Sequence, residues 1–128
     1  MPTDADIYNA WCWREDAVMQ PATRAAYSRL LAQGWIDATR HLHPGKRIYT
    51  FWTTARAFER NAGIRMDFLL LNPLLAPRLA AAGVDADYRG RERASDHAPA
   101  WIVLHDPANA GRGAAPSAKS TSKPPRKT

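Results

Sequence analysis

Residues 65–71, RMDFLLL, place an aspartate directly before four consecutive apolar residues. Such a short apolar run, preceded by Gly63 and followed by Asn72 and Pro73, predicts a β-strand. Because successive side chains of a strand point to opposite faces, the run 68–71 puts apolar side chains on both faces. The strand therefore belongs to a sheet that must be covered on both sides.

Residues 99–105 predict a second strand of this kind, since Trp101, Ile102, Val103 and Leu104 are also consecutive. The rest of the chain supplies a mixture of helices and strands, which predicts a layered α/β fold. The further elements that we expect are strands at 48–52 and, more weakly, 84–89, helices at 21–33 and 73–82, and a helical turn within 35–43. We expect a loop over 1–20 and a loop with some helical content over 53–64.

The two helices of useful length can cover only one face of the predicted sheet. No other segment is an obvious partner for the second face. The sequence therefore indicates that a partner chain, or the rest of a larger domain, covers it.

Residues 107–128 differ in composition from the preceding body, residues 1–106. They contain no aromatic residue, no Leu, Ile or Val and no acid, which predicts a disordered tail. The tail carries five of the 18 basic residues, so the net charge of +6 lies mostly there. Such a tail can bind nucleic acid weakly and without sequence preference. The many arginines of the body suit phosphate recognition or simply form a solvated surface.

The number of cysteines and the distribution of apolar residues predict where in the cell the protein is located. Cys12 is the only cysteine, so no disulfide can form within the chain. No run of 18 apolar residues predicts a membrane span, and the N-terminus lacks the pattern of a signal peptide. We expect a cytoplasmic protein that does not enter the membrane.

Asp67, Asp96 and His97 are the candidates for chemistry. Asp67 lies near the start of one strand, and Asp96-His97 directly precedes another. If these strands are neighbours, Asp67 can accept a hydrogen bond from one ring nitrogen of His97 and leave the other for proton transfer or phosphate contact. Asp96 then remains as an oxygen ligand for a hard cation such as Mg²⁺. The alternative is a pair of ordinary polar strand ends.

Other patterns give weaker signals. His41, His43 and Cys12 do not have the spacing of a zinc site, and no glycine-rich phosphate loop is present. Phe51 and Trp52 either pack in the core or stack on a nucleic-acid base.

Five segments, taken in this order and spacing, resemble the C-terminal half of the exonuclease III family. These enzymes are abasic-site endonucleases and 3′ exonucleases of the endonuclease/exonuclease/phosphatase superfamily. The most specific combination is RMDFLLL followed about 30 residues later by SDHAP. The segments are PTDADIYN (2–9), YTFW (49–52), RNAGIRMDFLLLNP (60–73), LAAAGVD (79–85) and YRGRERASDHAPAWIVL (88–104).

The resemblance implies that residues 1–106 form half of a four-layer α/β sandwich, a mixed β-sheet with flanking helices. It implies hydrolysis of phosphodiester bonds in DNA with Mg²⁺ or Mn²⁺, at abasic sites or blocked 3′ ends of duplex DNA. In the family, the main metal ligands and the water-activating aspartate lie in an N-terminal half that has no counterpart here. The resemblance thus implies a chain that is inactive or impaired without that half.

The resemblance also implies roles for individual residues. His97 matches the catalytic histidine, Asp67 the aspartate that orients it, and Asp96 the neighbouring aspartate associated with metal or water. DNA-binding positions are matched by Asn61, Arg65, Phe51 and Trp52. One departure is Ile64, because many members carry tryptophan there, which puts stacking at this position in question.

Two other functions stay open. The chain can be a non-catalytic fragment that binds DNA or docks on a partner. It can also keep the superfamily's chemistry and act on a small phosphate ester.

Overall fold

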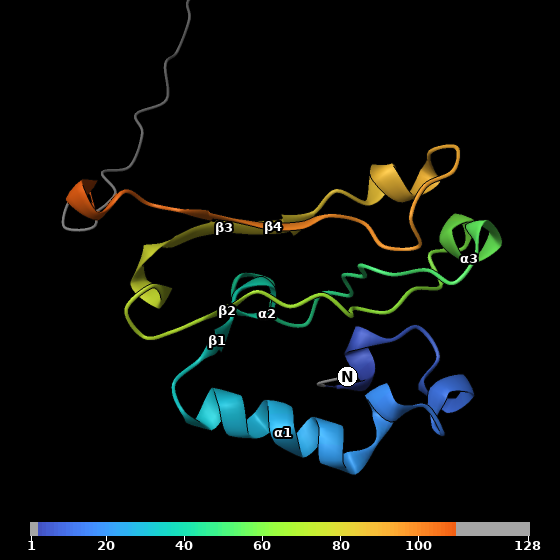
Figure 1. Cartoon of the computed structure of the whole chain (residues 1–128), viewed down its shortest axis with the longest axis horizontal. Coiled ribbons are helices and arrows are strands. Elements are labelled where there is room, and N and C mark those ends of the chain that lie inside the picture. The colour runs from blue at the N-terminus through green and yellow to red at the C-terminus, as the bar shows by residue number, and fades with distance from the viewer. Residues whose placement is uncertain (1–2, 110–128) are drawn as a thin grey trace, which may run out of the picture.

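The computed structural model of the chain describes residues 3–109 and has a mixed helix and strand fold (Figure 1). Its helices are α1 (Pro21–Ala32), α2 (Ala38–Leu42) and α3 (Ala55–Glu59), and its strands are β1 (Ile36–Asp37), β2 (Leu70–Leu71), β3 (Leu79–Val84) and β4 (Ala100–Leu104). Short 3₁₀ helices cover Asp4–Asp6, Ala10–Trp13, Ala17–Met19, Ala76–Arg78, Ala86–Gly90 and Pro107–Asn109. No helix within residues 3–109 is long and apolar enough to cross a membrane.

The predicted tail falls almost entirely outside the described residues. Only residues 107–109 of it are described, and they form a 3₁₀ turn. The division into a body, 1–106, and a disordered tail, 107–128, therefore stays a prediction.

Helix α1 forms as the sequence predicts, because Pro21 suits the first turn and Gly34, with a φ of 96°, takes the backbone out of the helix. It buries none of its residues completely, and Leu30 and Leu31 are more than a third exposed. The predicted helical turn in 35–43 is α2, and Asp37 caps it by accepting a hydrogen bond from the backbone of Arg40.

Two antiparallel pairs of strands lie on either side of α2 in the view of Figure 1. Strand β1 pairs with β2 at Ile36 and Leu71. Strands β3 and β4 form a longer hairpin, which confirms the strand predicted at 99–105. The hairpin packs on α2, and the His43 Nε2 lies 2.8 Å from the Ala82 carbonyl oxygen.

Two predicted elements are wrong. The helix expected at 73–82 is a turn that leads into β3, and the strand expected at 84–89 is replaced by the 3₁₀ turn Ala86–Gly90. Helix propensity favours the run of three alanines, but pairing with β4 overrides it. Gly83 does not end a helix; the ring of Trp101 lies only 2.5 Å from the place where a Cβ on Gly83 would stand.

Four extended segments form a ladder that brings the two ends of the predicted site together. The pairing runs from Ile7 to Ile64, from Ile64 to Phe51, and from Phe51 to His97. The backbone N–H of Trp52 donates to the Asp96 carbonyl oxygen at 2.9 Å. The predicted strand 48–52 thus lies beside Ile64, directly before the predicted strand 65–71. Of residues 65–71, only Leu70–Leu71 form a regular strand, which pairs with β1.

Strand β4 is apolar on both faces, as its sequence predicts. Ala100, Ile102 and Leu104 are half-buried, whereas Trp101 is 37% exposed and Val103 is 49% exposed. The described residues therefore cover one face of the hairpin and leave apolar side chains on the other.

Candidate active site

Asp67 and His97 meet at the surface. The Nδ1 of His97 lies 2.7 Å from the Oδ2 of Asp67, and each side chain is about two-fifths exposed, 43% for His97 and 41% for Asp67. A carboxylate can only accept, so Nδ1 carries the proton and Nε2 remains available to another group. The contact that the two strand ends predict therefore forms.

The ring of Phe51 contacts the imidazole edge to face, with the ring centroids 5.0 Å apart. The backbone N–H of His97 also donates to the Ser95 Oγ at 3.1 Å. Together with the hydrogen bond to Asp67, these contacts restrain the ring while leaving it accessible.

A surface hollow of about 440 Å³ adjoins His97. Its wall includes Tyr88, Arg91, Ser95 and Pro99. The guanidinium of Arg91 lies 3.7 Å from the centre of the Tyr88 ring, so a positive charge lies in the wall of the same hollow as His97. Glu92 adds a negative charge to this wall, so Arg91 is the group there that can pair with a phosphate.

Phe51 and Trp52, which are neighbours in sequence, lie in different environments. Phe51 is half-buried against His97, whereas Trp52 is 2% exposed and packs on Phe58 with 5.2 Å between ring centroids. The Nε1 of Trp52 donates to the Oδ1 of the exposed Asn61 at 3.2 Å. Of the two aromatic residues, only Phe51 offers surface at the site. Ile64 is 2% exposed and belongs to the core.

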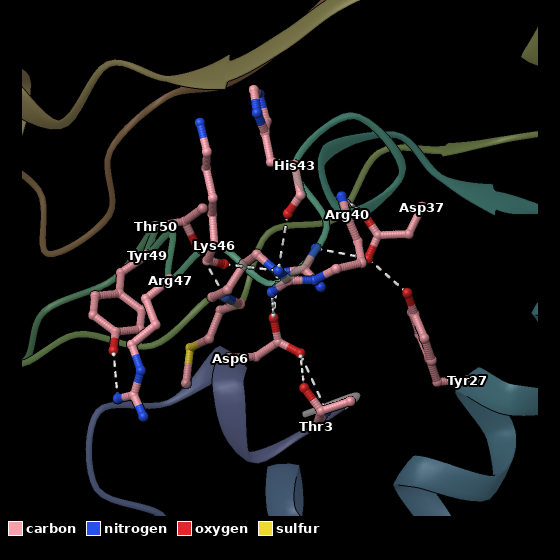
Figure 2. Close-up of polar contacts among 12 residues, drawn as sticks. Thr3, Asp6, Tyr27, Asp37, Arg40, His43, Lys46, Arg47, Tyr49 and Thr50 are labelled. Carbon is pink, nitrogen blue, oxygen red and sulfur yellow. Dashed lines mark hydrogen bonds and ion pairs between the residues drawn. The ribbon is translucent and has the colours of Figure 1, made fainter.

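Arg65 is fully buried, at 0% exposure, and lies in an ion-pair network. Figure 2 labels the other members of this network, Asp6, Tyr27, Asp37 and Arg40. Its Nε donates to the Asp6 Oδ1 at 2.7 Å and its Nη1 to the Asp37 Oδ2 at 2.6 Å. Arg40 also donates to Asp6, and the hydroxyl of Tyr27 donates to Asp37 at 2.6 Å. A side chain without exposed surface cannot contact DNA in this conformation, so we assign Arg65 a structural role.

The charges of this network stabilise one another. Burial opposes ionisation of Asp6, but hydrogen bonds and positive charges from Arg65 and Arg40 outweigh it and hold the pKa of Asp6 below its usual value of 3.8. Burial, together with the hydrogen bond to Asp37 and its negative charge, raises the pKa of the Tyr27 hydroxyl. Burial disfavours the charge of Arg65, but the two carboxylates outweigh it and raise the pKa of the guanidinium.

The lowered pKa of Asp6 predicts acid sensitivity. Its contribution to the free energy of unfolding is present above pH 3.8 and is lost as the pH falls through the lower folded-state value. Melting temperatures measured from pH 7 to pH 2.5 should therefore differ most between the wild type and Asp6→Asn at neutral pH, and converge in acid. Asp87→Asn, at an exposed position, is the control. A constant difference over the whole range would contradict this account of Asp6.

No protein-family model matches this chain. It is 34% identical over 108 residues to the exodeoxyribonuclease III of Haemophilus influenzae, covering 78% of this chain, and 33% identical to the DNA repair nuclease APEX1 of Danio rerio, covering 79%. Its fold matches that of an AP endonuclease from Archaeoglobus fulgidus with a TM-score of 0.75, over 80% of this chain at 33% identity. The chain is therefore similar to nucleases of the exonuclease III type.

The chain spans about 40% of the length of the exonuclease III relatives, namely 40% of the Haemophilus influenzae enzyme, 32% of APEX1 and 41% of the Archaeoglobus fulgidus chain. The match to these proteins is consistent with the C-terminal part of an exonuclease III-type nuclease. A 3′ phosphatase from Neisseria bound to a product DNA hairpin has the same TM-score of 0.75, at 35% identity, and the chain covers 40% of it.

The residues present do not fit a complete metal site of the kind expected in an exonuclease III-type enzyme. Asp96 is exposed beside His97, but residues 3–109 contain no group of three or more His, Cys, Asp or Glu side chains that could hold a metal ion. Mg²⁺ takes near-octahedral oxygen coordination through one or two carboxylates, water and substrate phosphate. Asp96 can supply one such carboxylate, and the described residues supply no further cluster around it.

Asp6 and Asp37, the two carboxylates that bind Arg65, are not among the residues that the sequence predicts for the site. Each has an apolar neighbour in sequence, Ile7 after Asp6 and Ile36 before Asp37. A carboxylate in such a position is costly unless it is paired, so the signal was available. The partner could not be identified, because Arg65 is 59 residues from Asp6 and 28 from Asp37.

Proposed function

We propose that this chain is the C-terminal part of a DNA repair nuclease of exonuclease III type, which hydrolyses phosphodiester bonds at abasic sites and 3′ ends. The observation that carries the proposal is the exposed pair of Asp67 and His97, joined by a 2.7 Å hydrogen bond. The similarity to exonuclease III-type nucleases supports it, as does the similarity to a structure described as a 3′ phosphatase bound to a DNA hairpin.

In this proposal His97 is the catalytic residue and Asp67 orients it. Asp67 accepts from Nδ1, so the Nε2 of His97 faces the substrate and can take a proton from, or donate one to, a phosphate oxygen. Phe51 offers the aromatic surface beside the reacting group. Asn61, which is exposed and accepts from the Nε1 of Trp52, is a further DNA-binding residue in this proposal. DNA with an abasic or blocked 3′ end is the proposed substrate.

We further propose that residues 1–106 form half of a four-layer α/β sandwich. The exposed Trp101 and Val103 on the outer face of the β3–β4 hairpin support this, because a further layer would bury them. The proposed Mg²⁺ or Mn²⁺ would need ligands besides Asp96. These 128 residues alone are therefore inactive or strongly impaired in this proposal.

A nicking assay on duplex DNA with one abasic site tests the proposal. The chain is assayed alone, mixed with the N-terminal part of an exonuclease III relative, and mixed in the presence of EDTA. We expect cleavage in the mixture with Mg²⁺ and little in the other two, and the N-terminal part alone is the control. Full cleavage by the chain alone would contradict the impairment. No cleavage in any mixture would contradict the nuclease proposal.

The second candidate is a non-catalytic fragment that binds DNA or docks on a partner. The uncovered apolar face at Trp101 and Val103 favours it, as does the missing cluster of metal ligands among residues 3–109. This candidate would be supported if a chain without residues 110–128 still bound DNA and no mixture cleaved DNA in the nicking assay.

A further inference from the structure

Thr50 contacts the backbone of Asp67, one residue of the candidate site, and that of Ala98, which directly follows the other, His97. The side chain of Thr50 is buried, at 1% exposure. The Oγ1 accepts from the backbone N–H of Asp67 at 3.0 Å and from that of Met66 at 2.9 Å. The carbonyl oxygen of the same threonine accepts from the N–H of Ala98, the residue after His97, at 2.8 Å.

The ladder is irregular at this point, which explains why a hydroxyl is needed. The carbonyl oxygen of Ile64 accepts from both Thr50 and Phe51, at 2.9 and 3.0 Å. Beyond Arg65 the chain turns out of the ladder, so the N–H groups of Met66 and Asp67 bond to a side chain instead of a backbone carbonyl. A threonine hydroxyl has two lone pairs and can accept both.

We propose that Thr50 is a positioning residue that sets the distance between Asp67 and His97. It holds Asp67 through its side chain and the histidine loop through its main chain, and it does not touch the reacting groups itself. The catalytic meaning of this role rests on the proposed function, but the positioning does not. Buried backbone N–H groups need a partner, so removing the hydroxyl should let residues 66–67 move.

Two substitutions separate the hydroxyl from the shape of the side chain. Thr50→Val keeps the branched shape and removes the acceptor, whereas Thr50→Ser keeps the acceptor and removes a methyl group. A merely structural role would make both variants less stable without changing the imidazole. A positioning role requires that Thr50→Val, but not Thr50→Ser, changes which ring nitrogen of His97 carries the proton.

The measurement is the ¹⁵N NMR spectrum of the His97 imidazole in the full 128-residue chain, at a pH where the ring is neutral. We expect the Nδ1–H tautomer in the wild type and in Thr50→Ser. Thr50→Val should lose it and resemble Asp67→Asn, in which the carboxylate acceptor is gone. A Thr50→Val variant that retains the Nδ1–H tautomer would overturn the proposal.

A second measurement covers the case in which Thr50→Val fails to fold. Amide hydrogen exchange in the wild type should show protection at Met66 and Asp67, lowered by about tenfold or more in any folded variant without the hydroxyl. Unprotected amides at both positions in the wild type would overturn the proposal. Neither measurement depends on cleavage, so a failure of the nuclease proposal in the nicking assay is distinguishable from a failure of Thr50 positioning.

Discussion

Replacing Arg65 with methionine is expected to lower the free energy of unfolding by about 3–5 kcal/mol. The guanidinium is fully buried and pairs with two carboxylates that are themselves buried, Asp6 at 0% exposure and Asp37 at 4%. Methionine fills much of the same space but leaves both charges in the interior without this partner. The cost comes from the unpaired carboxylates, since a buried ion pair adds little stability over an apolar substitute.

The ion pairs of Arg65 connect separate segments of the chain, which adds to the loss of stability expected in Arg65→Met. Arg65 joins the N-terminal segment at Asp6 to the end of β1 at Asp37. Tyr27 connects α1 to the same carboxylate of Asp37 (Figure 2). The guanidinium also lies 4.7 Å from the centre of the Phe68 ring. Loss of Arg65 therefore loosens several segments at once, including the segment 65–69 that carries Asp67.

Chemical denaturation of Arg65→Met and the wild type measures the difference, with Arg56→Met as the control. Arg56 is exposed in α3, so its substitution should change stability by no more than about 0.5 kcal/mol. In an Asp6→Asn background, Arg65→Met should lower the free energy of unfolding by about 0.5–3 kcal/mol less than in the wild type. The reason is that only one buried carboxylate, that of Asp37, is then left without Arg65. Equal costs for Arg65→Met and Arg56→Met would contradict the assignment of Arg65 to the core.

The sequence predicts the elements whose pattern is local. The helix at 21–33 has a proline start and a glycine end, and the strand at 99–105 is a continuous apolar run, and both form. The prediction fails at 79–82, where alanine favours a helix but the neighbouring β4 provides backbone partners. The identity of a partner strand is not a property of the segment itself.

The same distinction applies to the site. Asp67 and His97 could be paired in advance, because each lies at the end of an apolar strand. For Phe51 and Trp52 the alternation of a strand predicts that one faces the core, but not which one. The role of Thr50 could not be predicted, because it depends on a local irregularity of the ladder that has no sequence signature.

Replacing His97 with glutamine is expected to lower the rate of abasic-site cleavage about 10²- to 10⁴-fold, in the mixture that cleaves in the nicking assay. Glutamine can still form hydrogen bonds, but it cannot exchange a proton near neutral pH. Asp67→Asn should also lower the rate. A carboxylate can only accept, which fixes the proton on Nδ1 of His97, whereas an amide can also donate, so the imidazole is no longer held in one tautomer.

Binding must be measured beside the rate, since a misfolded variant would lose both. Affinity for an uncleaved abasic duplex should change little in His97→Gln, because most of the affinity of such proteins comes from phosphate contacts spread over the surface. His41→Gln, at an exposed position in α2, should cleave like the wild type. If His97→Gln retained wild-type cleavage, the Asp67–His97 pair would be no more than two polar strand ends in contact, and the proposed function would lose the observation that carries it.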